Sequence, residues 1–370
     1  MADVDHVGRG SGGRSGGSMA NVSLAALILL GTRFVQGFIF WGGASRRLFY
    51  DFHETAGVDQ AVKLDFSAPG FVAAKLTHAL PGALWLQAPI EWTLRHPDLI
   101  VASVWLWTLA ELAVGVGLML GIATRASAFV SIWLNVALMF IFGWMGSTCL
   151  DEWTMAVSGV AMSSALFLAG AGAYSLDNRW FIGSGLAQKR PWSAWIFSGP
   201  VPDAAVRKLA VWLGVACIAF TIITYQILFG AVVSALHSRV NFHHHNIAVT
   251  ALKVASDGSA IFDAYVNAGP DTGAAYIVSA KLLDGSGEVL AAWDGKTLAE
   301  LPATSIRNAY PYEWASHFET EVIGFSGQTG AKATITLPPP AGLKPSESGA
   351  RVLLLEGIDG SIWRGVGGAG

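Results

Sequence analysis

Charged side chains are scarce in this chain. Of its 370 residues, 13% are charged and 53% are hydrophobic, and the mean hydropathy is +0.48. A soluble domain typically carries about a quarter charged residues. The shortage is concentrated in the first two thirds of the sequence, so we expect a membrane part joined to a soluble part. The formal net charge of −3 offers no basic surface for a nucleic acid partner.

Cysteine is also rare. The chain has two, Cys149 and Cys217, which excludes a disulfide framework, a CxxCH haem site and a cysteine-ligated iron–sulfur cluster. A dinucleotide-binding fingerprint is missing as well. Three histidines are consecutive, at positions 243–245, and adjacent side chains point in different directions, so they do not form one metal site. We therefore expect no haem, flavin or metal cofactor.

Long apolar runs, in contrast, are plentiful. A bilayer core of about 30 Å needs roughly 20 apolar residues in a helix. Residues 1–21, rich in Gly and Ser, are expected to be disordered, and segment 43–98 holds only short, Pro-containing apolar pieces of amphipathic or re-entrant type. Five runs predict membrane spans, at 24–42, 99–121, 126–145, 153–173 and 209–232.

Lysine and arginine near the ends of the runs predict the orientation of the spans. The basic N-terminus, Arg125 and the basic segment 174–208 fall on one face, which we expect to be cytoplasmic. Segment 43–98, the turn at 146–152 and everything after the fifth run fall on the opposite face. The carboxyl-terminal part is therefore predicted to lie outside the cytoplasm.

After residue 234 the sequence changes character. Short runs with partial two-residue alternation are separated by Gly, Asp, Asn and Pro, a pattern typical of an all-β sandwich. The expected fold class is a membrane α-helical bundle, four helices plus one further span, followed by an all-β sandwich domain at 240–370.

Polar residues within the apolar runs are the first candidates for function. Arg33 and Glu111 each fall about 15 Å from the inner end of their run, at 1.5 Å per residue. A lone charge in lipid costs several kcal/mol, so we expect an Arg33–Glu111 pair. With Asn135 and Trp107 nearby, this pair predicts a quinone head-group pocket with a proton path. The alternative is a structural pair that determines helix packing.

Basic residues at the outer ends of the runs predict an anion site. Arg46 and Arg47 follow the first run, and His78 and His96 lie in the long segment after it. Guanidinium groups bind oxyanions in a fork, so these four residues are candidates for substrate binding. The alternative for the arginines is interfacial snorkelling.

Three reactive residues precede the fourth run. Cys149 is a candidate nucleophile if its thiolate is favoured, and Asp151 and Glu152 are candidates for proton transfer. The alternatives are a small buried filler for the cysteine and a position at a helix N-terminus, where the dipole favours acids, for the carboxylates.

The same region carries a resemblance to a known family. The residues Asp151-Glu152-Trp153-Thr154-Met155, the small-residue helix after them, and GAYSLD at 172–177 resemble DoxD, the membrane subunit of thiosulfate:quinone oxidoreductase, over about 22–200. The part from Tyr225 onward, including Phe229-Gly230, looks like the companion subunit DoxA. The chain thus resembles a DoxD–DoxA fusion, divided at about residue 200.

This resemblance implies an enzyme that oxidises thiosulfate to tetrathionate and passes two electrons to a membrane quinone. It also implies a location in the cell membrane of a bacterium or archaeon. The partners would be thiosulfate, quinone and the lipid bilayer, and assembly into a homo-oligomer stays open. The alternative function is a non-enzymatic DoxX-like membrane anchor or assembly protein whose β domain binds a partner.

Overall fold

The computed structural model describes residues 24–50, 63–145, 151–184, 190–233, 240–255, 257–339 and 349–369. These residues divide into two compact units. The first, here called the helical unit, comprises Met1–Ala44, Leu109–Leu134 and Ser158–Ala219. The second, here called the mixed unit, comprises Ser45–Thr108, Asn135–Val157 and Phe220–Gly370.

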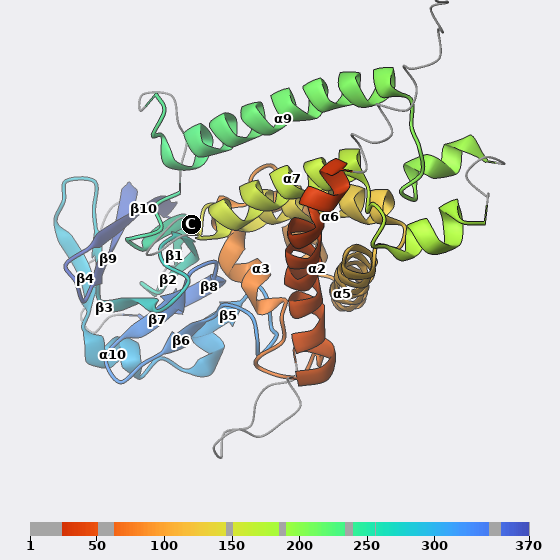
Figure 1. Cartoon of the computed structure of the whole chain (residues 1–370). Coiled ribbons are helices and arrows are strands. Elements are labelled where there is room, and N and C mark those ends of the chain that lie inside the picture. Colours follow the sequence, from red (N-terminus) through yellow and green to blue (C-terminus); the bar gives the residue numbers. More distant parts are fainter. Residues whose placement is uncertain are drawn as a thin grey trace, which may run out of the picture. The chain divides into compact units, whose positions relative to one another are not determined.

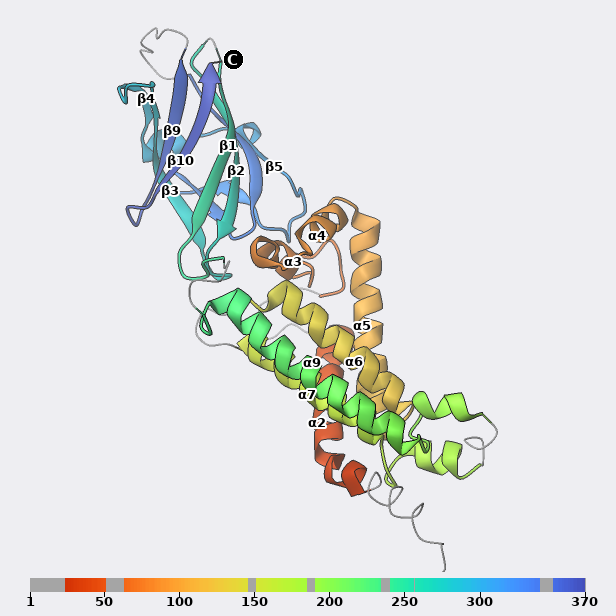
Figure 2. The same ribbon diagram turned by 90° about the horizontal axis from the view of Figure 1, so that it is seen from above.

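Four helices in the described part of the chain are long and apolar enough to cross a membrane. They are α5 (Pro97–Leu120), α6 (Thr124–Phe142), α7 (Asp151–Ala169) and α9 (Asp203–Phe229), and Figures 1 and 2 show each as one continuous helix. They correspond to the second to fifth predicted spans. Their length and composition are those of a multi-pass membrane protein. A third or less of the most apolar window of each is buried, so the described residues leave most of each window uncovered.

The first predicted span corresponds to a shorter helix. Helix α2 (Leu30–Ser45) has 16 residues and continues into the π-helix η1 (Arg46–Tyr50), and residues 24–28 before it are also helical. That this helix crosses the membrane stays a prediction.

Glycines bring α2 and α5 into close contact within the helical unit. A Cβ on Gly37 would lie 3.0 Å from the Gly115 carbonyl oxygen, and one on Gly115 would lie 2.6 Å from the Trp41 nitrogen. Small residues of this kind let backbones approach closely between membrane helices. Because Gly37 meets Gly115 and Met119 while Gly43 meets Glu111, the two helices run antiparallel.

Short helices precede α5 in the mixed unit and pack against the β strands (Figures 1 and 2). They are α3 (Ala74–Ala79), the 3-10 turn η2 (Leu80–Gly82) and α4 (Gln87–Leu94). One buried cluster joins Phe71, Leu80, Leu94 and Ile100 to Trp314 of the carboxyl-terminal domain. Residues 71–94, which lie between the first two predicted spans, therefore contribute to a folded core.

A polar contact and a glycine hold α3 on the β domain. The Thr77 hydroxyl lies 2.9 Å from the Ser316 hydroxyl and accepts the Ser316 backbone N–H at 3.2 Å. Gly330 has a φ of +86°, and a Cβ there would lie 1.9 Å from the Thr77 carbonyl oxygen. A side chain at position 330 would therefore separate the two surfaces.

The described part of the β domain contains ten strands. The alternating burial of their residues explains why these segments form strands. In β2 (Ala260–Ala268) every second residue is buried, including Phe262 and Val266, so one face covers the core. The remaining strands are β1 (Asn246–Val254), β3 (Ala274–Leu283), β4 (Val289–Trp293), β5 (Ile306–Asn308), β6 (Phe318–Thr320), β7 (Phe325–Gln328), β8 (Lys332–Leu337), β9 (Ala350–Gly357) and β10 (Ile362–Ala369).

The strands belong to one continuous sheet in the order β5-β8-β2-β1-β10-β9-β3-β7-β6, with β4 beside β3. All neighbours are antiparallel except β1 and β10. The end strands β5 and β6 are joined through Asn308, whose side chain donates to the Phe318 carbonyl oxygen at 2.9 Å and accepts the Phe318 N–H at 2.8 Å. The predicted fold class, a helical membrane bundle followed by an all-β domain, is confirmed.

Candidate functional site

Arg33 is buried in the helical unit, with 4% of its surface exposed. Its guanidinium donates to two backbone carbonyls that follow α7, those of Ala171 at 3.0 Å and Tyr174 at 2.7 Å. These oxygens lie beyond the end of the helix, where carbonyl groups lack helical partners. The predicted Arg33–Glu111 pair is therefore wrong, because the Arg33 guanidinium is hydrogen-bonded to these two carbonyl oxygens and not to the Glu111 carboxylate.

The register of α2 against α5 explains this error. The Glu111 carboxylate lies against Gly43, where a Cβ would come within 3.0 Å of Oε2, and Arg33 Nη1 lies beside Gly121. Gly43 is ten residues after Arg33, which is about 15 Å along the helix. Equal distance from predicted span ends did not amount to equal depth, because the packing of the glycines determines the register.

A buried group of polar side chains lies one turn beyond Arg33. The Gln36 amide nitrogen donates to the hydroxyls of Ser131 on α6 at 3.1 Å and Ser163 on α7 at 3.2 Å, and the two hydroxyls are 2.6 Å apart. None of the three residues is more than 1% exposed. Such residues within a membrane bundle are uncommon and usually functional. The amino-acid sequence gives no signal for this group, because Gln and Ser side chains carry no charge that would distinguish them.

Two buried polar atoms on α2, one on Arg33 and one on Gln36, have no hydrogen-bond partner among the described residues. They are Arg33 Nε and Gln36 Oε1. The first can only donate and the second can only accept. The two residues are three apart in α2, so they share one face of the helix. A bound molecule that accepts one hydrogen bond and donates another would satisfy both atoms.

Asp177 and Arg125 bind backbone groups near the N-terminus of α6 in the helical unit. Asp177 is 3% exposed and accepts the backbone N–H groups of Ala123 and Thr124, at 2.8 and 3.0 Å, where α6 begins. It also accepts the N–H and hydroxyl of Ser198. This contact caps the helix and favours a negative charge there.

Whereas Asp177 binds backbone N–H groups, Arg125 binds backbone carbonyl groups in the same region. Its guanidinium donates to the carbonyls of Phe167, Ala194 and Gly199 at 3.0, 2.5 and 2.7 Å. From the sequence alone, Arg125 indicated only which ends of the spans face the cytoplasm. In the structure it links α6 to the end of α7 and to η4 (Pro191–Trp195), which is a structural role.

The other two predicted quinone residues belong to the mixed unit. Asn135 is buried, with 3% exposure, and Trp107 is half-buried on α5. Both have interaction partners within the chain. Their membership of a quinone site with Arg33 and Glu111 stays a prediction.

The two predicted substrate arginines differ in environment. Arg46 is exposed, whereas Arg47 is 9% exposed and donates to the Thr108 hydroxyl at 3.4 Å. Both begin η1, directly after α2, and both have further partners within the chain. The burial of Arg47 argues against simple snorkelling for that residue, and substrate binding by either arginine stays a prediction.

Two of the three predicted catalytic residues, Asp151 and Glu152, begin α7. Cys149 falls outside the described residues, so its role as a nucleophile stays a prediction. Helix α7 begins at Asp151, with Glu152 as the next residue. Both therefore lie in the first turn, where the helix dipole favours acidic residues. Proton transfer by Asp151 or Glu152 is not tested by this position.

The two predicted substrate histidines lie in different surroundings. His78 is half-buried, its Nδ1 has no partner among the described residues, and burial lowers its pKa despite the opposing charge of Asp271. The lowered pKa favours the neutral imidazole, and substrate binding by His78 stays a prediction. His96 is exposed, and its Nδ1 lies 2.7 Å from the Trp92 carbonyl oxygen.

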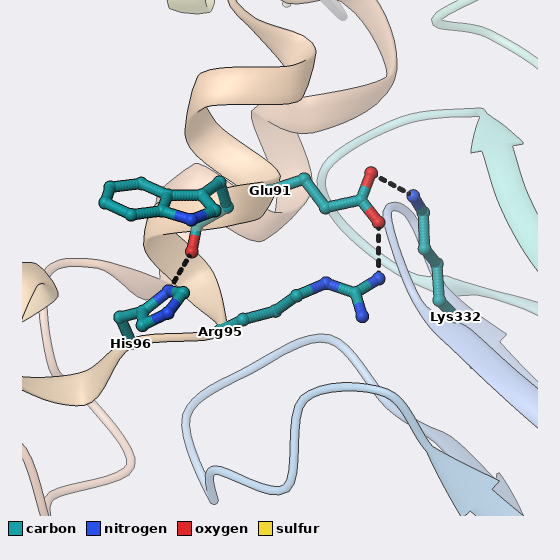
Figure 3. Close-up of polar contacts among 5 residues, drawn as sticks. Glu91, Arg95, His96 and Lys332 are labelled. Atoms are coloured by element: carbon teal, nitrogen blue, oxygen red, sulfur yellow. Dashed lines mark hydrogen bonds and ion pairs between the residues drawn. The ribbon is translucent and has the colours of Figure 1, made fainter.

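A cluster of charges joins α4 to β8 (Figure 3). The Glu91 carboxylate is 2.8 Å from Lys332 Nζ on one oxygen and 2.8 Å from Arg95 Nη2 on the other. Burial alone would raise the pKa of Glu91, but hydrogen bonds from the two cations outweigh it and lower the pKa. The figure shows the His96 ring turned away from the Glu91–Lys332 pair. We call Glu91, Arg95 and Lys332 the outer charge cluster.

Within the described residues, no group of three or more His, Cys, Asp or Glu side chains is placed to hold a metal ion. The prediction that no metal cofactor is needed is not tested by this finding.

The helices and the β domain together define a class of protein: a multi-pass membrane protein that carries a folded all-β domain at its carboxyl end. Residues 45–192 match the family described as TQO small subunit DoxD, and residues 229–365 match the family described as TQO small subunit DoxA. TQO stands for thiosulfate:quinone oxidoreductase. The chain is therefore a DoxD–DoxA fusion, as the resemblance predicted. No solved structure matches the chain.

Proposed function

We propose that this protein oxidises thiosulfate to tetrathionate and transfers the two electrons to a membrane quinone. The family names support the general class of oxidoreductase. The proposed reaction is balanced: two thiosulfate dianions join through one new S–S bond, the quinone accepts the two electrons, and two protons convert it to quinol. In this proposal the β domain lies outside the cytoplasm and thiosulfate approaches from that side.

The observation that supports quinone reduction is the pair of unsatisfied atoms on α2. A quinone carbonyl accepts a hydrogen bond, as Arg33 Nε requires, and a quinol hydroxyl donates one, as Gln36 Oε1 requires. The hydrogen-bonded hydroxyls of Ser131 and Ser163 adjoin Gln36 and offer a route for protons. An apolar anchor would not need unsatisfied polar atoms in its core, because such atoms are costly to bury.

Purified full-length protein with thiosulfate and decyl-ubiquinone tests the function, with quinone reduction followed by absorbance. We expect reduction that depends on thiosulfate, with tetrathionate as the product. No reduction at acidic or neutral pH would overturn the proposal. An absorption band from a bound haem or flavin would overturn the scheme in which thiosulfate electrons reach the quinone without a resident cofactor.

Gln36→Leu tests the quinone-binding role of the pair. The two serine hydroxyls still bond each other in this variant, so we expect the melting temperature to change little and quinone reduction to fall about tenfold or more, the effect of losing one or two hydrogen bonds to the reacting group. Ser164→Ala is the matched control, because the Ser164 hydroxyl donates to the Val160 carbonyl within its own helix. Equal activity in both variants would remove Gln36 from the site.

Cys149→Ser separates two routes for the sulfur chemistry. In one route the Cys149 thiolate and one thiosulfate join through a new S–S bond, and the quinone takes up the two electrons. A second thiosulfate then attacks the sulfane sulfur of this adduct, which forms tetrathionate and releases the Cys149 thiolate. In the other route thiosulfate sulfur reacts with the quinone directly. Full activity of Cys149→Ser excludes the covalent thiol route and leaves the direct one.

A further inference from the structure

The outer charge cluster carries an excess of positive charge. One carboxylate, that of Glu91, is shared by two cations, Arg95 and Lys332, so the three groups sum to one positive charge. Arg95 uses one nitrogen, Nη2, on Glu91, and a guanidinium has five N–H donors. Its other two nitrogens have no partner among the described residues. Donors and net charge therefore remain for an anion.

Tyr310 is a buried tyrosine beside the outer charge cluster: the backbone N–H of the preceding residue, Ala309, donates to the Lys332 carbonyl oxygen at 2.8 Å, and Tyr310 packs in the same buried cluster as Leu94, the residue before Arg95. Tyr310 is 1% exposed, and among the described residues its hydroxyl has no hydrogen-bond partner. Burial raises its pKa, and the charge of Glu91 raises it further while that of Arg95 opposes the shift. The hydroxyl therefore keeps its proton at neutral pH. An unpaired buried hydroxyl is costly, which indicates a missing acceptor.

The residues of the cluster differ in their exposure to water. The Arg95 side chain is 57% exposed, that of Lys332 is 23% exposed, and Tyr310 is buried. The Lys332 ammonium also lies 4.5 Å from the centre of the Tyr265 ring, and burial raises the pKa of this second tyrosine as well. Arg95 is thus the most accessible cation for an anion from water, and neither tyrosine presents a negative phenolate that would repel it.

The cluster also requires both family regions of the chain. Glu91 and Arg95 lie in the segment that matches DoxD, whereas Tyr310 and Lys332 lie in the segment that matches DoxA. The core cluster of Phe71, Leu94 and Trp314 holds the two segments together. A site made of both regions gives a physical reason for joining them in one chain.

We propose that Arg95, Lys332 and Tyr310 form a binding site for a small sulfur oxyanion dianion, the substrate thiosulfate or the product tetrathionate. The identity of the ligand depends on the proposed function, the oxidation of thiosulfate. The site adds Arg95, Tyr310 and Lys332 to the residues predicted to contact substrate, and substrate binding by His78 and His96 stays a prediction. The same chemistry would also accept the phosphate of a lipid headgroup, because α4 directly precedes the membrane span of α5.

Direct binding of radiolabelled thiosulfate to the full chain in neutral detergent tests the site. We expect the wild type to bind, and Arg95→Gln and Tyr310→Phe each to weaken binding about tenfold or more, as loss of a hydrogen bond to a charged ligand implies. Lys281→Gln is the matched control, because it removes an exposed cation that pairs with Glu356 at 3.5 Å on the same domain. Tyr310→Phe removes only a hydroxyl that has no partner among the described residues, so we expect this variant to fold normally. If Arg95→Gln does not fold, the binding measured with Tyr310→Phe decides whether the site exists.

Three outcomes would overturn the site: no thiosulfate binding by the wild type, equal binding by Tyr310→Phe and wild type, or phosphatidylglycerol that occupies the site and is not displaced by thiosulfate. Failure of the proposed function has a different signature. Thiosulfate would bind and depend on Arg95 and Tyr310, but no quinone would be reduced.

Discussion

The Glu91 carboxylate and the Lys332 ammonium lie 2.8 Å apart, although 241 residues separate them in the chain. The first residue is on a short helix before the span of α5, and the second begins β8 of the carboxyl-terminal domain. Side-chain exposures of 28% and 23% place the pair at the edge of the buried cluster around Leu94 and Trp314. The ion pair thus connects parts of the chain that the families describe as separate subunits.

Acid should weaken this connection. Because the folded-state pKa of Glu91 is below its ordinary value of 4.5, its contribution to the free energy of unfolding is fully present above about pH 4.5 and is lost as the pH falls through the folded pKa. We expect Glu91→Gln to lower stability by about 1–2 kcal/mol near pH 7, and the difference from wild type to vanish at low pH. Thermal unfolding from pH 7 to pH 3 measures it.

Glu300→Gln is the control for that experiment. Its pair with Lys296 is exposed at 81% and 69% and spans 4.0 Å, so little change is expected at any pH. A constant difference between Glu91→Gln and wild type across the pH range would contradict the assignment.

Arg33→Gln should destabilise the helical unit. The substitution removes charge-assisted hydrogen bonds to the carbonyls of Ala171 and Tyr174, and hydrogen bonds to charged groups contribute about 1.5–3 kcal/mol. We expect a clear fall in the melting temperature in detergent. Phe34→Leu, at a neighbouring residue that is 53% exposed, should leave it unchanged. A melting temperature unchanged in Arg33→Gln would contradict the observed contacts.

Gly115→Ala tests the close approach of α2 and α5. Its Cβ would lie 2.6 Å from the Trp41 nitrogen and 2.9 Å from the Trp41 Cα, and the backbone of α2 must move to accommodate it. We expect a loss of about 1–3 kcal/mol, as for overpacked cores. Gly31→Ala, with nothing within 4 Å of its Cβ, should be neutral or slightly stabilising. Equal unfolding temperatures of the two variants would disprove the register.

Asp177→Asn should loosen the start of α6. The carboxylate accepts from Ala123, Thr124 and Ser198, and an amide retains only one accepting oxygen. We expect a loss of about 1–3 kcal/mol, measured by thermal unfolding and by faster hydrogen exchange at Thr124. Asp98→Asn, at an exposed acid in the first turn of α5, is the control. Exchange that is unchanged at Thr124 would rule out the cap.

Much of the architecture could be predicted from local sequence patterns. A helix of about 20 apolar residues has few alternatives to a bilayer, and the predicted second to fifth spans coincide with α5, α6, α7 and α9. Alternation of buried and exposed residues, as in Ala260–Ala268, depends only on neighbouring residues in the strand. The family resemblance rested on similarly short motifs and is confirmed.

The candidate sites could not be predicted in the same way. Arg33 was singled out by its charge, but its partners are carbonyl groups at positions 171 and 174, and every residue has a carbonyl group. Gln36 meets Ser131 and Ser163 only because three helices converge there. No sequence signal distinguishes these serines from the many others in the chain.

The sequence by itself determined which segments are apolar enough for lipid, which segments form strands, and which two families the chain combines, because each depends on composition and spacing over a few to about twenty residues. Only the tertiary structure decided which polar groups meet. It placed Glu111 at Gly43 instead of Arg33, and it brought Lys332 to Glu91. The physical reason is that helix register follows from the steric fit of side chains at contacts such as Gly37 and Gly115, and this fit involves residues far apart in the chain.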